Sequence, residues 1–324
     1  MYLFANIFKH TIWGGNRITR MKNVDDMPYR VGESWEISAI PGCESVVADG
    51  PDAGLPLSQL ISKYGADLMG KHVFETCGTC FPLLVKFIDA NDNLSIQVHP
   101  DDETAQQRHH SSGKTEMWYV MESAPDASIL VGFDHDLTRQ QFTEAVKNQE
   151  ILSHIRLHQV KEGDAFFLPA GRVHSIGSGT LLAEIQQSSD ITYRIYDYGR
   201  VGDDGKPRAL HTELAADVLD LKAHPDYRTH YEQKPDERVC LADCHYFHTN
   251  LLDIDKPLQI SYADNDSFVI LMCVDGKAEL SQQGGIDANC RTVSQGQTLL
   301  IPASAEKVSI QPDSSCRLLE ITIP

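Results

Sequence analysis

The sequence predicts a mainly β protein built from two barrel-like domains, with a few helices at the periphery. Two observations carry this prediction. Most segments of the chain are short runs rich in aliphatic, β-branched and aromatic residues, separated by Gly, Pro, Asn and Asp. In addition, one strand-and-turn pattern occurs twice, in the same order and with a constant spacing.

Three stretches have the 3.6-residue period of amphipathic helices and account for the peripheral helices. They are residues 55–69, 137–155 and 210–221. We expect the second helix to begin after Asp136, a residue type that favours the N-cap position. The remaining punctuated runs are read as strands, so the helices are additions to a β framework.

The repeated pattern lies at residues 160–176 and again at 293–310. A turn glycine, an apolar strand and a Pro-Ala turn recur with an offset of 133, which aligns Gly163 with Gly296. The recurrence indicates that each half of the chain contains a domain of the same kind.

A polar segment at residues 231–237 is the expected boundary, which gives domains of 1–235 and 236–324. The two copies differ at a position that could bind a metal, because His174 of the first corresponds to Lys307 of the second. The second copy also lacks an upstream Gln-x-His. We therefore expect any metal in the first domain and none in the smaller C-terminal domain.

Length, composition and charge restrict the class of protein. The chain has 324 residues, 41% hydrophobic and 23% charged, which allows a large buried core. No segment approaches the roughly 20 uninterrupted apolar residues that would span a bilayer, and the opening residues do not resemble a secretion signal. We therefore expect a cytoplasmic protein without a membrane partner.

The formal net charge of −18 argues against nucleic acid as a partner. Nucleic-acid binding depends on many cationic contacts, which an acidic chain does not supply. A small phosphorylated ligand needs only a few local cations and stays compatible with this charge.

Four polar side chains of the first domain are candidate metal ligands. Polar and apolar residues alternate in LSIQVHPDD, so Gln97 and His99 share one face of a strand. Glu116 lies in the next strand-like run, and His174 follows a Pro-Ala-Gly turn. An isolated histidine is more often a hydrogen-bonded strand residue, but two imidazoles, a carboxylate and an amide together suit zinc or a similar divalent ion. The set predicts a catalytic rather than a structural metal site.

Four motifs, SIQVHPDD, GKTEMWYV, LPAGRVHSIG and YRIYDYGR, occur in an order that resembles the type I mannose-6-phosphate isomerases, in their short bacterial form. The segments IWGG and GESWEIS near the start also fit. The resemblance is strong over residues 1–221 and covers the rest only as a degenerate second barrel. It implies the cupin superfamily, so both domains are expected to be cupin-like jelly-roll barrels, with one zinc ion per chain.

The resemblance also assigns roles to residues of this sequence. It places the zinc ion between Gln97, His99, Glu116 and His174. It matches Arg194 with the family's catalytic arginine, and Ser95 with a residue that donates a hydrogen bond to the substrate phosphate. The NHKPE-type sequence of the longer members is absent here, so no further catalytic group is carried over.

Two lysines complete the expected site. Lys114 precedes Glu116 by two residues and shares its strand face, so it could bind sugar hydroxyls, take part in proton transfer or hold phosphate. Lys86 interrupts an apolar strand, either facing inward for similar work or as an edge charge that discourages aggregation. Arg194 is expected to face inward, its alternative being a surface or phosphate-paired arginine.

The implied function is zinc-dependent interconversion of D-mannose 6-phosphate and D-fructose 6-phosphate by proton transfer between C1 and C2. A divalent metal and a fixed guanidinium would stabilise the charge that develops on the neighbouring oxygen. The general base is left open among a metal-bound water, Lys114 and a histidine. The alternatives are another cupin enzyme, such as a sugar epimerase or metal oxygenase, and a non-catalytic sugar-binding cupin. We expect a monomer or homodimer.

Overall fold

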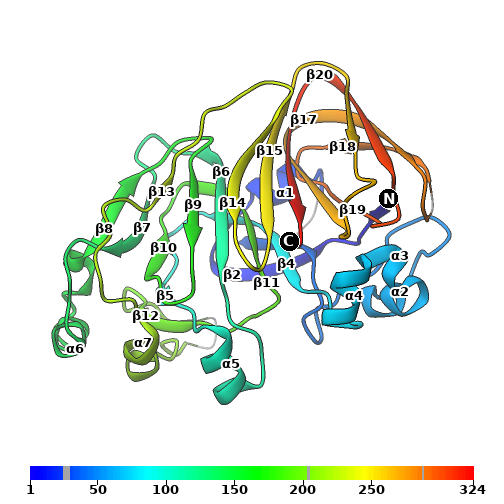
Figure 1. The fold of residues 1–324 in the computed structure, drawn as a ribbon. Coiled ribbons are helices and arrows are strands. Elements are labelled where there is room, and N and C mark those ends of the chain that lie inside the picture. The colour runs from blue at the N-terminus through cyan, green and yellow to red at the C-terminus, as the bar shows by residue number, and fades with distance from the viewer. Residues whose placement is uncertain (25–29, 203–204, 287) are drawn as a thin grey trace.

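Three antiparallel β-sheets make up most of the fold (Figure 1). The computed structural model describes residues 1–24, 30–202, 205–286 and 288–324. Two of the sheets are formed by the N-terminal part of the chain, and the third is formed mainly by the C-terminal part. The predicted mainly β fold is confirmed.

The first two sheets have seven and five strands, in the orders β13-β9-β6-β11-β4-β2-β3 and β12-β5-β10-β7-β8. The seven strands are β13 (Arg228–Thr229), β9 (Ala165–Leu168), β6 (Glu116–Ser123), β11 (Thr180–Gln187), β4 (Leu83–Ala90), β2 (Ile7–Gly15) and β3 (Val31–Ile37). The five are β12 (Tyr193–Tyr196), β5 (Ile96–Val98), β10 (His174–Ile176), β7 (Ser128–Phe133) and β8 (Ile155–Gln159).

These two sheets pack face to face. Trp118 and Phe166 of the seven-stranded sheet share a buried cluster with Ile129 and Val131 of the five-stranded sheet. Each sheet ends in edge strands, such as β13, β8 and β12. The sheets therefore form an open sandwich instead of the closed barrel that the sequence suggested.

The third sheet has eight strands, in the order β1-β19-β17-β20-β15-β14, with β16 paired to β20 and β18 to β17. Its strands are β1 (Tyr2–Leu3), β14 (Arg238–Asp243), β15 (His248–Ile254), β16 (Leu258–Ser261), β17 (Val269–Gln283), β18 (Cys290–Ser294), β19 (Thr298–Ile301) and β20 (Lys307–Thr322). Tyr2 pairs with Leu300, so the first strand of the chain belongs to the C-terminal sheet.

The internal repeat corresponds to equivalent strands in the two halves. β9 and β19 are both four residues long and begin at residues 165 and 298, which are 133 apart. Gly163 and Gly296 precede them with φ of +85° and +86°, a conformation that glycine adopts without steric cost. Lys307 begins β20 as His174 begins β10, so the second copy has no imidazole at this position.

Short helices lie at the edges of the sheets (Figure 1). They are α1 (Arg17–Met21), α2 (Leu57–Tyr64), α3 (Ala66–Met69), α4 (Lys71–Cys77), α5 (Asp102–His109), α6 (Arg139–Lys147) and α7 (Thr212–Val218), with a 3₁₀ turn η1 (Ile151–His154). Each predicted helical stretch contains a helix, but the first is divided into α2 and α3 at Gly65.

The predicted N-cap of α6 is wrong. Thr138 caps the helix, because its hydroxyl accepts a hydrogen bond from the Gln141 N–H while the Gln141 side chain accepts one from the Thr138 N–H. Asp136 instead accepts hydrogen bonds from Lys222 and from the backbone N–H of Ala223. The sequence contained two suitable cap residues, and the capping box selects the second.

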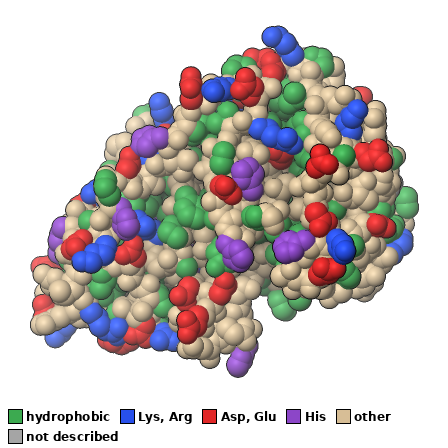
Figure 2. Space-filling view, viewed as in Figure 1, with side chains coloured by type: hydrophobic (Ala, Val, Ile, Leu, Met, Phe, Trp, Pro, Cys, Tyr) green, Lys and Arg blue, Asp and Glu red, His purple; other side chains and the backbone are tan. Residues whose placement is uncertain are grey.

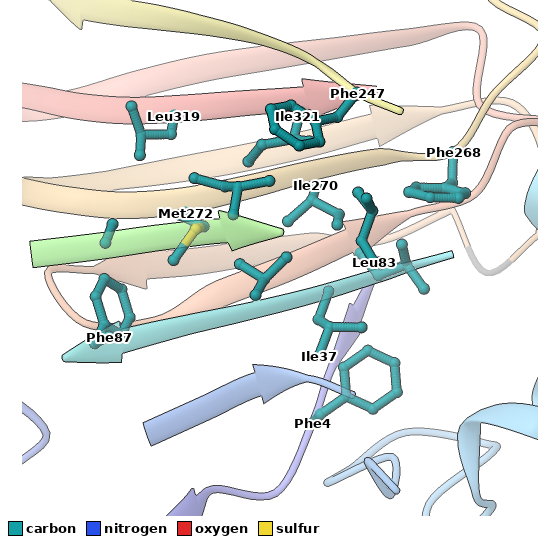
Figure 3. Close-up of a cluster of buried hydrophobic side chains, with 14 of the residues drawn as sticks. Phe4, Ile37, Leu83, Phe87, Phe247, Phe268, Ile270, Met272, Leu319 and Ile321 are labelled. Carbon is teal, nitrogen blue, oxygen red and sulfur yellow. The ribbon is translucent and has the colours of Figure 1, made fainter. Parts of the chain in front are cut away.

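The seven-stranded and eight-stranded sheets share one hydrophobic core (Figure 3). Leu83 and Phe87 of β4 lie in the same buried cluster as Ile270 and Met272 of β17 and Leu319 of β20. The C-terminal sheet therefore covers one face of the seven-stranded sheet. The opposite face, toward the five-stranded sheet, is the one available for a site.

The surface carries no large patch of one charge on the face shown in Figure 2, where acidic and basic side chains are interspersed. Of the helices within the described ranges, none combines the length and the apolar composition needed to cross a membrane.

Candidate active site

The candidate metal ligands meet between the two N-terminal sheets. His174 of β10 lies opposite Gln97 of β5, and His99 follows directly after β5 in the same five-stranded sheet. Glu116 begins β6 of the facing sheet. The sandwich therefore brings together residues that are up to 77 positions apart in the chain.

Three of these side chains form a tight buried cluster. The ligating atoms of His99, Glu116 and His174 all lie within 4.8 Å of one another. The Nε2 atoms of His174 and His99 are 3.3 and 3.5 Å from the two Glu116 carboxylate oxygens. Gln97 Nε2 is 3.3 Å from His174 Nε2, and a half-turn of the amide would place the Gln97 Oε1 atom there instead.

Both histidines are oriented for metal binding through Nε2. The Nδ1 atoms of His99 and His174 lie 2.8 Å from the carbonyl oxygens of Ile191 and Arg172. Donation from Nδ1–H fixes the tautomer and leaves the Nε2 lone pair directed at the cluster. Among the described residues, the buried His99 Nε2 atom has no hydrogen-bond partner. A divalent cation at the cluster centre would satisfy it, so the residues fit zinc.

The electrostatics of the cluster favour a bound cation. Burial, aided by the Lys114 ammonium, lowers the pKa of His99 well below its usual value, and burial lowers the pKa of His174 to about 4. Both imidazoles are therefore neutral, as ligands must be. Burial and the charge of Glu184 raise the pKa of Glu116 to about 7. The surroundings therefore disfavour the ionised carboxylate, and a bound cation would stabilise it.

A row of charged and aromatic side chains crosses the sheet beside the cluster. Lys86 of β4 lies opposite Glu184 of β11, which in turn lies opposite Trp118 of β6. Lys86 Nζ is 2.8 Å from Glu184 Oε1 and 3.5 Å from Glu33 Oε2, while the Trp118 indole donates to Glu184 Oε2 at 2.8 Å. Burial alone would lower the pKa of Lys86, but these two carboxylates raise it above its ordinary value. Lys86 is thus a buried ammonium with its charge compensated.

Arg194 and Lys114 extend the site outward from the cluster. Arg194 of β12 lies opposite Gln97, and its Nε donates to Ser95 Oγ at 3.3 Å. Burial and the charge of Arg208 lower the Arg194 pKa, although a guanidinium stays protonated in proteins. Lys114 Nζ lies 3.0 Å from a Glu116 carboxylate oxygen.

A pocket of about 310 Å³ lies beside the cluster, a volume within the range of small-ligand sites. Its walls carry both signs of charge, with four cationic side chains among them. The lining residues are Trp13, Glu33, Lys86, Ile88, Leu94, Ser95, Gln97, Lys114, Ile176, Glu184, Asp190, Thr192, Arg194 and Arg208. All eight predicted site residues therefore lie in the cluster or on this pocket wall.

Four charged residues on the pocket wall were not predicted: Glu33, Glu184, Asp190 and Arg208. Glu184 had a detectable signal, because it interrupts the apolar run TLLAEIQQ as Lys86 interrupts LLVKFIDA. Two opposite charges in two apolar strands indicate a buried pair. Asp190 and Arg208 lie outside the strands, where no local pattern marks them.

Comparison with known protein families matches both halves of the chain. Residues 1–128 match the family "Phosphomannose isomerase type I, catalytic domain". Residues 237–322 match "Mannose-6-phosphate isomerase, cupin domain". The cupin character expected of the fold is thereby confirmed.

Individual relatives cover most of the chain. The mannose-6-phosphate isomerase ManA of Bacillus subtilis is 35% identical over 286 residues, which cover 86% of each chain. The mannose-6-phosphate isomerase of Streptococcus mutans is 42% identical over 212 residues, 65% of each chain.

Solved structures have the same architecture. The crystal structure of the mannose 6-phosphate isomerase from Bacillus subtilis superposes with a TM-score of 0.87, at 28% identity, and covers 99% of this chain and 98% of that one. The structure of a putative mannosephosphate isomerase from Archaeoglobus fulgidus has a TM-score of 0.80 at 20% identity and covers 99% of this chain and 97% of that one. This second match shows a similar fold. Together with the identity to the Bacillus relative over most of both lengths, these matches show that the chain belongs to the type I phosphomannose isomerase family, a family of aldose–ketose isomerases.

Proposed function

We propose that this protein interconverts D-mannose 6-phosphate and D-fructose 6-phosphate with one zinc ion per chain, moving a proton between C1 and C2. The observation that carries the proposal is the buried cluster of His99, Glu116 and His174 beside a pocket lined by lysine and arginine. The family membership supports the same activity. The proposed catalytic unit is residues 1–235, although β1 pairs in the C-terminal sheet, and the proposed second domain is residues 236–324, without metal ligands.

The zinc ion would be held by Gln97, His99, Glu116 and His174. Nitrogen and oxygen ligands of this kind suit zinc. When bound, the ion supplies Lewis acidity toward the sugar oxygens on which negative charge develops. We include Gln97 because its amide lies next to the His174 Nε2 atom.

The cationic side chains suit an anionic sugar. Arg194 would stabilise the charge that develops on the oxygen next to the reacting carbon, because a fixed guanidinium costs no reorganisation during the reaction. Ser95, hydrogen-bonded to Arg194, would donate to the phosphate. Arg208 lines the same pocket, but its Nε and Nη2 atoms donate to Asp197, so only the remaining N–H groups of this guanidinium would contact a phosphate.

The two lysines have different surroundings and therefore different proposed roles. Lys86 is compensated by Glu184 and Glu33, so we assign it to the sugar hydroxyls and not to the phosphate. Lys114 lies beside the ligand Glu116 and lines the pocket, where it can hold or move a proton at the sugar oxygens.

The test is a coupled assay on mannose 6-phosphate with purified protein, metal analysis, and exhaustive chelation followed by readdition of zinc. We expect turnover that is lost with the chelator and restored by zinc. Arg194→Ala should lower kcat by at least about 100-fold, as expected for removal of a charge-stabilising group. The matched control is Arg139→Ala, which removes an arginine on the exposed surface of α6.

Full activity in metal-free protein would contradict the zinc assignment. Unchanged turnover in the Arg194→Ala variant would contradict the role of the arginine. Activity on a different sugar phosphate, with none on mannose 6-phosphate, would contradict the substrate.

A further inference from the structure

Arg194 lies in a strand of the five-stranded sheet that has few hydrogen bonds to its neighbours. Its strand, β12, is an edge strand, paired only with β5 within that sheet. The register with β5 shifts between Arg194 and Tyr196, so the ladder is irregular directly after the arginine. An edge strand leaves backbone groups without a partner strand, and an irregular register changes the direction of the side chains beside it.

On the open side of β12, His211 makes the hydrogen bonds to Arg194 that a neighbouring strand would make. The Arg194 N–H donates to the His211 Nδ1 atom at 3.0 Å, and the His211 N–H donates to the Arg194 carbonyl oxygen at 2.7 Å. Both polar backbone groups of Arg194 are thus bound by the same residue. Such a two-point contact restricts rotation of the strand about its own axis as well as its displacement.

The residues beside His211 hold the rest of the arginine. The Ala209 carbonyl accepts a hydrogen bond from Arg194 Nη1 at 3.1 Å. Arg208 Nε donates to Asp197, which follows β12, at 2.7 Å. Residues 208–211 therefore run alongside β12 and contact both the backbone and the guanidinium of Arg194.

The imidazole of His211 binds the Arg194 backbone and does not cap a helix. His211 occupies the N-cap position of α7, where a side chain usually accepts a hydrogen bond from the helix N-terminus, but it makes no such bond. Burial, together with the charges of Arg194 and His109, lowers the pKa of His211 and so favours the neutral ring. The Arg194 N–H that points at Nδ1 then selects the tautomer that carries its proton on Nε2.

We propose that His211 is a positioning residue that sets the backbone of Arg194, and through it the direction of the guanidinium in the pocket. The proposal rests on the role proposed above for Arg194. His211 itself does not line the pocket, so its effect on turnover would be transmitted through β12.

The test compares kcat and KM of His211→Ala and His211→Asn with wild-type protein, each loaded with zinc to equal content. We expect His211→Ala to lower kcat by about 10- to 100-fold, the cost of a small misplacement of a catalytic group. Because the Arg194 N–H loses its acceptor, the melting temperature should fall by a few degrees, so kcat is measured well below the melting temperature of each variant. Asn places its Oδ1 atom near the position of Nδ1, so His211→Asn should recover most of the lost kcat.

The control is His224→Ala, which removes an imidazole bound to Asp220 in the same half of the molecule but outside the pocket. It should leave kcat unchanged. A kcat within twofold of wild type in His211→Ala would overturn the inference, as would a His211→Asn variant no more active than the Ala variant. Absence of isomerase activity in the wild-type protein would instead refute the proposed function, so the two failures are distinguishable.

Discussion

Lys86 and Glu184 lie opposite each other in neighbouring strands, and their side chains are 7% and 3% exposed. A buried charge is tolerated when its partner is close and its remaining hydrogen bonds are made. Here Trp118 donates to the second oxygen of Glu184, and Glu33 lies on the other side of the ammonium. Although burial would raise the pKa of Glu184, Lys86 and Lys114 lower it to about 2.

We expect Glu184→Gln to destabilise the fold by about 3 kcal/mol, because it leaves the Lys86 charge buried with only the more distant Glu33 to compensate it. Urea unfolding of the metal-loaded protein measures this change. The matched control is Glu33→Gln, which removes a carboxylate 3.5 Å from Lys86 whose side chain is 18% exposed. Its cost should be about 1 kcal/mol. Equal costs for the two variants would contradict the argument.

At the scale of single residues, the sequence identified the candidate ligands but not their electrostatic surroundings. Gln97 and His99 were visible because strand alternation puts them on one face, and the structure brings Glu116 and His174 to them. The role of Glu184 was not predicted, because it depends on pairing with Lys86, which is almost one hundred residues away in the sequence. A charge in an apolar strand is ambiguous until the register of the sheet is known.

The capping box of α6 supports a prediction for a single element. Thr138→Ala should lower the free energy of unfolding by about 1 kcal/mol, since one helix N–H loses its acceptor. Thr143→Ala removes the same hydroxyl from the interior of α6, where it only bonds back to carbonyls of its own helix, and should change stability by less than about 0.5 kcal/mol. Both variants should keep full isomerase activity, because α6 does not line the pocket. A loss of kcat would show that α6 affects the site.

Strands and helices differ in how well the sequence predicted them. The repeat located β9 and β19 because a glycine with positive φ and a proline bracket each strand, and both requirements are local. Helix bounds were less well predicted. Gly65, with φ of +54°, separates α2 from α3 inside one continuous apolar pattern. Periodicity records which face is buried and does not record where the backbone turns.

The Tyr246 hydroxyl forms a hydrogen bond between the C-terminal part of the molecule and the segment before Lys114. Tyr246, between β14 and β15, donates to Asp102 at 2.7 Å. Asp102 also accepts hydrogen bonds from the Gly113 N–H and from the Gln187 side chain, and Gln187 accepts one from Thr115. The contact therefore reaches the residues on either side of the lysine.

We expect Tyr246→Phe to lower kcat several-fold and to release zinc at a lower chelator concentration, because the loop before Glu116 loses part of its support. Steady-state kinetics and a chelator titration measure the two effects. Tyr262→Phe is the matched control, since it removes a hydroxyl bonded to Glu320 within the C-terminal sheet. It should lower stability and leave kcat unchanged. The same kinetic effect in both variants would indicate general destabilisation and not a specific connection.

At the scale of the whole molecule, composition and the repeat predicted the class of fold, and the resemblance predicted cupin domains. The sequence did not show that the two halves share a core, because a continuous apolar run such as LLVKFIDA indicates burial on both faces of a strand but not which sheet covers each face. Phe87 of β4 and Met272 of β17 read as ordinary strand residues until the sheets are seen together (Figure 3). Burial between sheets is a tertiary property that local patterns do not encode.

The pairing of β1 with β19 also has a consequence for the order of events during synthesis. Tyr2 and Leu3 are synthesised almost 300 residues before their partners Leu300 and Leu299. Until β19 has been synthesised, β1 has no partner strand, and its unpaired backbone groups are exposed to pairing with neighbouring nascent chains. We therefore expect chaperone dependence in the cell to be greatest before Leu299 and Leu300 have been synthesised.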